Sequence, residues 1–328
     1  MEETLSLNGL HALTGSERVL IVRLGAMGDI LHALPAVENL KRRYPALGID
    51  WIVKPRWTPL LEGNPALRRV IPFDREGGSV WATARRLREA GYHLAVDLQG
   101  LIQSALVAKF SGAKNTIGYA RAACREPLAS IFYGRRVQPK SRHIAEMHLD
   151  LIRALGVSDS SLDCTLPAGE AEGTLPEGNF VLANPFAGWQ SKQWPLPHYE
   201  RLAKLLAEKK GLPLVLNVPE ADRPRLGNMQ HARAHVSSLP GLIHATRLAT
   251  AVVGVDSGPL HLAAALHRPG VALFGPTDPA RNGPLSGTIT VLRDPAAQLS
   301  YKRVDAESEC MRRLSPEAVF EALRSAMK

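Results

Sequence analysis

The sequence has little cysteine and few aromatic residues. Its three cysteines, Cys124, Cys164 and Cys310, lie far apart and form no CxxC pair. This indicates neither a zinc site nor a disulfide framework and suits a reducing compartment. Aromatic residues make up 5% of the chain and the basic residues are scattered, whereas a nucleic-acid binder more often has one dense basic face with aromatic residues in between. We therefore expect no metal site and no nucleic-acid partner.

Long apolar runs and known nucleotide loops are absent as well. No run approaches the ~18 apolar residues that a membrane-spanning helix requires, and residues 1–16 include Glu2 and Glu3 and lack the basic start of a signal peptide. There is no GxxxxGKS or GxxxxGKT loop, and a GxGxxG fingerprint would need a glycine where Met27 stands. The missing fingerprint disfavours a hydride-transfer enzyme.

What the sequence does contain is a large hydrophobic fraction and an excess of positive charge. Its 328 residues are 45% hydrophobic, which is enough for two domains with ordinary cores. The net charge of +9 favours anionic partners through long-range attraction. Apart from nucleic acid, these are an anionic membrane surface and phosphorylated or acidic small molecules.

Two series of alternating strands and helices fill most of the chain. Apolar periodicity predicts strands over 18–24, 49–53, 70–73, 94–98, 116–119, 180–184, 214–218, 252–255, 271–274 and 289–292. It predicts helices over 30–44, 80–90, 102–110, 143–155, 197–210, 223–234, 238–250, 259 to the stop at 269–270, and 315–327. Such alternation is typical of parallel sheets covered by helices, so we predict two doubly wound α/β domains.

The domain boundaries follow from changes in composition. Residues 1–16 read as a flexible tail, residues 17–160 as the first domain and residues 161–178, rich in small and polar residues, as the linker. The second domain then spans 179–310, and residues 311–328 form a C-terminal helix that could pack back onto the first domain. Ligands of doubly wound sheets bind beyond the carboxyl ends of the strands, so we expect the site in a cleft where one turn from each half meets the other.

The stretch from Ala251 to Pro279 reads strand, turn, helix, strand, turn. Its first turn contains Asp256, Ser257 and Gly258, and His261 lies in the first turn of the helix that follows. A helix that begins at a strand end directs free N–H groups and partial positive charge beyond the sheet, which suits a phosphate. The alternative is that Asp256 and Ser257 only cap the helix.

Three further residues follow strands and could carry chemistry. Asp29 follows the first strand and could take a proton from an incoming hydroxyl, or it could cap the helix that is expected from Ile30. Lys192 lies on the turn after strand 180–184 and could bind phosphate, or it could be an ordinary surface lysine. Glu220 follows strand 214–218 and could hold ribose hydroxyls, or it could be a solvated loop acid.

Five motifs together resemble one family, the bacterial lipopolysaccharide heptosyltransferases, which use ADP-heptose and form glycosyltransferase family 9. The motifs are RVLIVRLGAMGDILHALPAV, DLQGLIQSAL, REPLASIFY, KQWP and GVDSGPLHLAAALHRPGVALFGPTDP. The second and third look most like the heptosyltransferase I branch. The resemblance implies the GT-B fold, in which two Rossmann-like domains face each other across a cleft, and an inverting transfer of heptose to 3-deoxy-manno-octulosonic acid on lipid A. It also implies a cytoplasmic enzyme, peripheral to the inner membrane, with no obligatory metal or cofactor.

The same resemblance assigns roles to residues of this chain. Asp29 becomes the catalytic base. The donor-binding residues are Gly188, Lys192, Glu220, Asp256, Ser257, Gly258 and His261. The expected acceptor-binding residues are Met27, Gly28, Gln99, Arg125 and His143. The acceptor-side basic cluster of the heptosyltransferase I branch has no match at residues 75–78, so another sugar–lipid core or another glycan stays open as the acceptor, as do another nucleotide-sugar donor and a non-catalytic binding protein.

Overall fold

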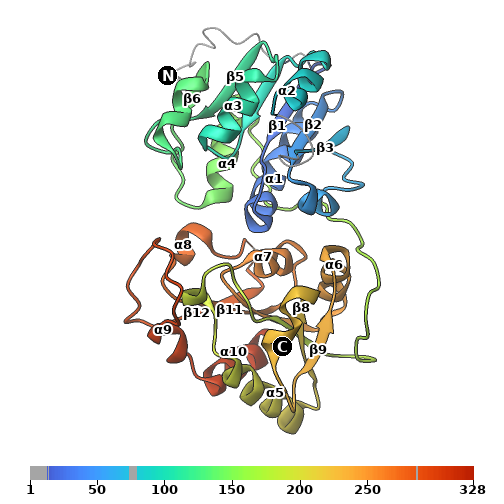
Figure 1. The fold of residues 1–328 in the computed structure, drawn as a ribbon, viewed down its shortest axis with the longest axis vertical. Coiled ribbons are helices and arrows are strands. Elements are labelled where there is room, and N and C mark those ends of the chain that lie inside the picture. The colour runs from blue at the N-terminus through green and yellow to red at the C-terminus, as the bar shows by residue number, and fades with distance from the viewer. Residues whose placement is uncertain (1–12, 14, 74–79, 286) are drawn as a thin grey trace. The chain divides into compact units, whose positions relative to one another are not determined.

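The chain folds into two compact units, and each is a doubly wound α/β domain (Figure 1). The computed structural model describes residues 13, 15–73, 80–285 and 287–328. Most of the expected tail and residues 75–78 lie outside the described residues. Unit 1 comprises Met1–Thr165 and unit 2 comprises Leu166–Lys328.

Unit 1 contains one parallel sheet of six strands in its described residues, in the order β3-β2-β1-β4-β5-β6. The strands are β1 (Arg18–Val22), β2 (Gly48–Val53), β3 (Arg69–Pro72), β4 (Leu94–Asp97), β5 (Asn115–Tyr119) and β6 (Arg135–Val137). The helices are α1 (Met27–Arg43), α2 (Val80–Glu89), α3 (Ile102–Phe110) and α4 (Ile144–Arg153), with 3-10 helices η1 (Pro55–Leu60) and η2 (Pro127–Phe132).

Unit 2 repeats this plan, with the strand order β12-β11-β10-β7-β8-β9. Its strands are β7 (Val181–Asn184), β8 (Leu214–Val218), β9 (Arg233–Val236), β10 (Ala251–Val255), β11 (Gly270–Phe274) and β12 (Ile289–Arg293). Its helices are α5 (Leu196–Lys210), α6 (Leu239–Leu248), α7 (Gly258–Ala265), α8 (Pro279–Asn282), α9 (Glu309–Arg312) and α10 (Pro316–Ala326), with η3 (Gln190–Lys192) and η4 (Glu220–Leu226). This confirms the predicted fold class.

The strand order fixes where a ligand can bind in each unit. In unit 1 the chain direction across the sheet reverses between β1 and β4, where Val22 pairs with Asp97. In unit 2 it reverses between β7 and β10, where Gly254 pairs with Asn184. Loops diverge at such a reversal and leave a crevice beyond the carboxyl ends of the two central strands. The turns after β1, β4, β7 and β10 are therefore the favoured positions for functional residues.

Two predicted helices differ from the observed structure. The helix expected over 223–234 is wrong: η4 ends beside Gly227, whose φ of +61° is left-handed, and Arg233–Val236 then pairs with β8 as the edge strand β9. The helix expected from Ile30 begins at Met27 instead. Asp29 consequently lies inside the first turn of α1 rather than in front of it.

Helix α10 packs into the core of unit 2. Val319, Phe320 and Leu323 are buried in the same hydrophobic cluster as the central strands and α5. Ser315 caps the helix by accepting a hydrogen bond from Ala318 N at 3.2 Å. The apolar stripe of α10 is thereby used within its own unit.

Candidate functional site

In unit 2 a buried carboxylate lies at the end of β10 and gathers three polar side chains around it. Asp256 Oδ2 accepts hydrogen bonds from Lys192 Nζ and from Thr277 Oγ1, both at 2.6 Å. On the other side, His261 Nε2 lies 3.6 Å from Asp256 Oδ1. These residues follow β7, β10 and β11, which are neighbours in the sheet. The structure therefore brings together the predicted residues Lys192, Asp256 and His261.

The contacts of Asp256 fix its charge state. Burial alone would raise the pKa of Asp256, but the hydrogen bond with His261 and the positive charge of Lys192 outweigh it and hold that pKa well below its usual range. Asp256 is therefore an anion at neutral pH. Its carboxylate holds Lys192 and Thr277 at the strand ends through hydrogen bonds.

Lys192 is held from a second direction by an aromatic ring. Its Nζ lies 4.6 Å from the centroid of the Trp189 ring, which is a cation–π contact. Only 17% of the Lys192 side chain is exposed. An ordinary surface lysine would be mobile and solvated, so the burial and the two defined partners favour a functional position for Lys192.

The turn before α7 does not use its polar side chains as helix caps. No side-chain hydrogen bond caps α7 at Ser257, whose hydroxyl donates to Val255 O at 3.2 Å instead. The carboxylate of Asp256 is likewise occupied by Lys192 and Thr277. The capping alternative is thus not realised here, and the first N–H groups of α7 point beyond the carboxyl end of β10, as at other helix N-termini that bind anions.

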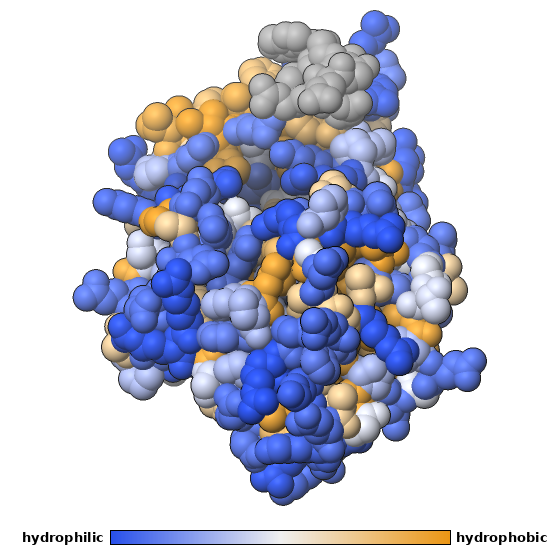
Figure 2. All heavy atoms as spheres, turned by 60° about the horizontal axis from the view of Figure 1, so that its bottom comes forward, coloured by the Kyte–Doolittle hydropathy of each residue, from blue (hydrophilic) through white to orange (hydrophobic). Residues whose placement is uncertain are grey.

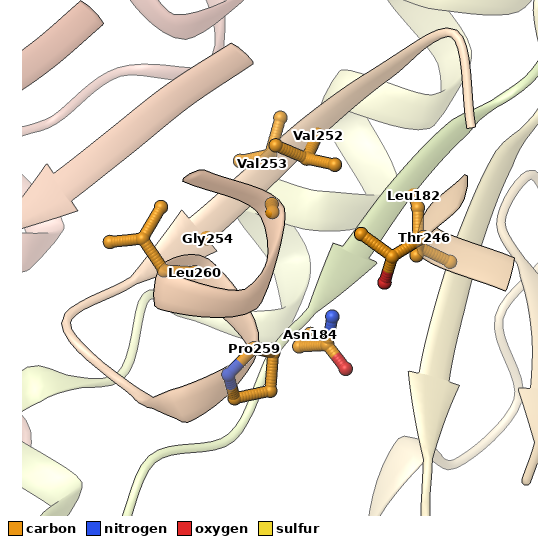
Figure 3. A pocket seen from close by; sticks show the side chains of 9 residues that line it. Leu182, Asn184, Thr246, Val252, Val253, Gly254, Pro259 and Leu260 are labelled. Atoms are coloured by element: carbon orange, nitrogen blue, oxygen red, sulfur yellow. The ribbon is translucent and has the colours of Figure 1, made fainter. Parts of the chain in front are cut away.

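A small pocket lies behind the start of α7 (Figure 3). Its walls come from β7, β10, α6 and α7, with Asn184 and Pro259 near one another in the view and apolar side chains around most of the rest. Its volume of about 10 Å³ is at the limit for a single water molecule. This space therefore belongs to the packing of α7 on the sheet and is too small for a nucleotide.

The two remaining predicted donor residues are open to solvent. Glu220 begins η4 after β8, has 76% of its side chain exposed and lies 4.0 Å from Arg223. Gly188 is exposed in the turn after β7, and a Cβ at this position would meet nothing within 4 Å. Both residues lie on the same edge of the sheet as Asp256, but no contact joins either of them to the Asp256 cluster.

In unit 1 the carboxylate of Asp29 is fixed by two partners. Its Oδ2 accepts a hydrogen bond from Ala26 N at 3.0 Å, and its Oδ1 forms a 2.8 Å ion pair with Arg23. Arg23 is 4% exposed and also donates to Leu98 O at 2.7 Å. Asp29 thus stabilises the start of α1 from inside its first turn, not as the cap in front of a helix from Ile30, and 32% of its side chain stays open to solvent. A structural role and a chemical role are compatible at this position.

The loop after β4 is tied to the loop after β1. Gln99 Oε1 accepts a hydrogen bond from Leu24 N at 2.8 Å, so Gln99 lies at the same reversal point as Arg23 and Asp29. Gly28 is half-buried, whereas the side chain of Met27 is 5% exposed and belongs to the core. Met27 can thus contribute backbone rather than side-chain contacts.

The other two predicted acceptor residues have separate surroundings. Arg125 is exposed in the segment that packs on Gly100. His143 caps α4, where its Nδ1 accepts a hydrogen bond from Ala145 N at 3.3 Å. Its ring also packs edge-on against His32 of α1, with centroids 5.4 Å apart. This contact places His143 beside the helix that carries Asp29, although part of its role is structural.

Sequence reasoning missed two functional partners, Arg23 and Thr277. Arg23 is the only charged residue between Val19 and Leu24, and an isolated charge at the end of an apolar strand is a signal that could have identified it. Thr277 lies in the turn after β11, and a threonine in a turn carries no comparable signal in the sequence. Within the described residues, no group of three or more His, Cys, Asp or Glu side chains is placed to hold a metal ion.

None of the helices in the described ranges is both long and apolar enough to cross a bilayer. The face shown in Figure 2 is mainly hydrophilic and is interrupted by smaller hydrophobic groups.

The fold is that of a two-domain α/β protein, and the polar cluster of unit 2 lies at the strand ends, where ligands of such sheets bind. Residues 80–311 match the model of glycosyltransferase family 9 (heptosyltransferase), and the chain belongs to this family. It is accordingly a glycosyltransferase of the GT-B fold class, which consists of two Rossmann-like domains. The resemblance drawn from the five motifs is confirmed.

Known members of the family match most of the chain. Lipopolysaccharide heptosyltransferase 1 of Pseudomonas aeruginosa is 32% identical over 293 residues, with 81% of each chain covered. Lipopolysaccharide heptosyltransferase 1 of Escherichia coli K12 is 31% identical over 312 residues, with 86% of this chain and 95% of that relative covered. The E. coli heptosyltransferase WaaC, solved with ADP-2-deoxy-2-fluoro heptose, superposes with a TM-score of 0.74 at 28% identity and covers 93% of this chain and 98% of its own.

Proposed function

We propose that this protein transfers a heptose from ADP-heptose to an inner-core acceptor of the lipopolysaccharide type, 3-deoxy-manno-octulosonic acid on lipid A, with inversion at the anomeric carbon. The observation that carries the proposal is the buried Lys192–Asp256–His261 cluster at the reversal point of unit 2 in a chain of the heptosyltransferase family. One solved relative, WaaC, contains an ADP-heptose analogue, which supports the choice of donor.

The donor would bind to unit 2 through its diphosphate. Lys192 and His261 approach the diphosphate from the ends of β7 and β10, and the free N–H groups at Ser257 and Gly258 supply the helix contribution. As the bond from the heptose to ADP breaks, negative charge grows on the departing phosphate, and these preorganised donors stabilise it. Gly188 leaves room for the sugar, and Glu220 receives the ribose hydroxyls.

Asp29 would act as the base. It takes the proton of the acceptor hydroxyl while the hydroxyl oxygen bonds to the anomeric carbon and ADP leaves. Arg23 and the Ala26 N–H hold the carboxylate in one orientation. Less conformational entropy is therefore lost when the carboxylate aligns with the acceptor hydroxyl. The acceptor would lie against the backbone of Met27 and Gly28 and against three side chains, those of Gln99, Arg125 and His143. This chemistry requires neither a metal ion nor a cofactor.

We further propose that the enzyme works at the cytoplasmic face of the inner membrane as a peripheral protein. The net charge of +9 supports this placement, because the acceptor and the surface that carries it are both anionic.

The test is mass spectrometry of products from a panel of donors and acceptors. ADP-heptose, a UDP-sugar and GDP-mannose are each incubated with truncated lipid A cores, with and without EDTA. We expect a heptose-sized mass increase with ADP-heptose only, unchanged by EDTA. Transfer from another nucleotide-sugar would contradict the donor, transfer to a different glycan would contradict the acceptor, and binding of ADP without any transfer would indicate a non-catalytic protein.

A further inference from the structure

The 3-10 helix η2 exposes an aliphatic pair next to the predicted acceptor loop. Leu128 is 53% exposed and Ile131 is 58% exposed. In a 3-10 helix residues three apart lie directly above one another, so the two side chains share one face. The opposite face of η2, with Ala129 and Ser130, is buried against the rest of unit 1. The exposed pair is therefore held on a fixed element rather than on a loose loop.

Several hydrogen bonds fix η2 to the loop after β4. Glu126, which precedes η2, donates its N–H to Gly100 O at 3.0 Å and accepts a hydrogen bond from Ile102 N at 2.6 Å. Tyr133, which follows η2, donates its hydroxyl to the buried Asp97 at 2.7 Å. These bonds hold Leu128 and Ile131 at a defined distance from Gln99 and Gly100. A surface that contacts the pair is held at that distance as well.

The segment that contains the pair is basic. The segment from residue 121 to residue 140 contains five basic residues and one acidic residue. Arg121, Arg125 and Arg136 are exposed, and Arg136 is fixed next to η2 by its bond from Nε to Ser130 O at 2.8 Å. The one acid, Glu126, is engaged with the start of α3 and therefore offsets little of this charge toward solvent.

A protein partner fits this surface poorly. A stable protein–protein interface buries roughly 800 Å² on each side and is enriched in aromatic residues, whereas two aliphatic side chains in a basic segment provide much less apolar area. An anionic bilayer fits better, because aliphatic side chains enter the headgroup region and each nearby arginine adds attraction.

We infer that the face formed by Leu128 and Ile131, with Arg136 fixed beside it, is the surface by which unit 1 binds an anionic phospholipid membrane. The inference rests on the proposed function, because it specifies how the enzyme reaches a lipid-linked acceptor. Docking through η2 would hold the loop of Gln99 and Gly100 close to the headgroups, where the sugar of such an acceptor emerges.

The test is co-sedimentation of the full chain with vesicles of phosphatidylcholine alone or of phosphatidylcholine containing phosphatidylglycerol. We expect binding to the anionic vesicles, weakened about tenfold by L128S/I131S through lost apolar burial and about fivefold by R136Q through lost charge. L248S is the matched control for the aliphatic change, since Leu248 is also 53% exposed but lies on α6 of unit 2. R86Q, at an exposed position of α2, is the control for charge.

Thermal melting establishes that each variant is folded. Equal loss of binding in L248S and L128S/I131S, or equal binding of the wild type to both kinds of vesicle, would overturn the inference. A second readout is heptose transfer to a deacylated, water-soluble acceptor, which L128S/I131S should leave unchanged. Absence of that transfer in the wild type would refute the proposed function while the vesicle result still decides the role of η2.

Discussion

Breaking the Lys192–Asp256 pair should destabilise unit 2 more than removing both charges. The pair is buried, with 17% of the lysine side chain and 6% of the aspartate side chain exposed. In K192M the carboxylate loses its 2.6 Å partner, and an uncompensated buried charge of this kind costs about 3–5 kcal/mol. In K192M/D256N no buried charge is left, and the new amide oxygen can still accept a bond from Thr277, so the cost should be ~2 kcal/mol or less.

Thermal and urea unfolding of the wild type, both single variants and the double variant measure this coupling directly. For a domain of this size about 1 kcal/mol corresponds to 2–4 °C in Tm, so K192M should melt roughly 10 °C below the wild type, with the double variant in between. Calorimetry with ADP should show about tenfold to hundredfold weaker binding in K192M and in the double variant, because each lacks the charge-assisted donor.

The pH dependence follows from the lowered pKa of Asp256. The ionised carboxylate stabilises the folded state above its unfolded pKa of about 3.9, and this stabilisation is lost as pH falls below that value toward the lower folded pKa. K192M/D256N should therefore lose less stability than the wild type as the pH falls below about 4. A K192M protein as stable as the wild type, or with unchanged ADP affinity, would refute the reasoning.

Three further substitutions test other parts of the structure, each by urea unfolding. G25A should cost about 1–3 kcal/mol, since φ is +148° at this position and a Cβ would lie 2.7 Å from Trp57 Nε1; unchanged stability would contradict that contact. Y133F should cost about 1–3 kcal/mol, because the buried Asp97 loses its 2.7 Å donor; a neutral effect would mean that the bond is dispensable. L323A should cost about 2–5 kcal/mol, since Leu323 is fully buried in unit 2; a small loss would show that α10 packs loosely.

The central strands and the turns that follow them could be predicted because their signals are local. Apolar runs such as Val252–Val255 have no alternative to a buried strand, and a proline after Gly258 marks the start of α7. The edge strand β9 could not be predicted in this way. Its sequence Arg-Ala-His-Val is half polar, and only pairing with β8 makes it a strand, so tertiary context overrides local propensity.

The positions of Lys192, Asp256 and Asp29 after strands were predictable, but the partners Thr277 and Arg23 were not. Lys192 and Asp256 each follow a strand, which marks them individually. That Thr277 would complete the shell of Asp256, or that Arg23 would pair with Asp29, depends on how neighbouring strands align, and no local pattern encodes this. The start of α1 was placed too late because Ala26 offers no capping side chain, so the residues before Ile30 read as a turn.

The most direct test of the central claim asks whether the turn of Asp29 and the turn of Asp256 serve different functions. The claim assigns proton removal to Asp29 and ADP binding to the Lys192 cluster. D29N is compared with D159N, since Asp159 is another aspartate of unit 1 that pairs with an arginine, Arg42. ADP binding is measured by calorimetry and heptose transfer by mass spectrometry.

We expect D29N to bind ADP like the wild type while its transfer rate falls at least ~100-fold, and we expect D159N to keep both. Transfer at the wild-type rate in D29N would contradict the role of Asp29. Loss of ADP binding in D29N would contradict the assignment of binding and proton removal to separate turns.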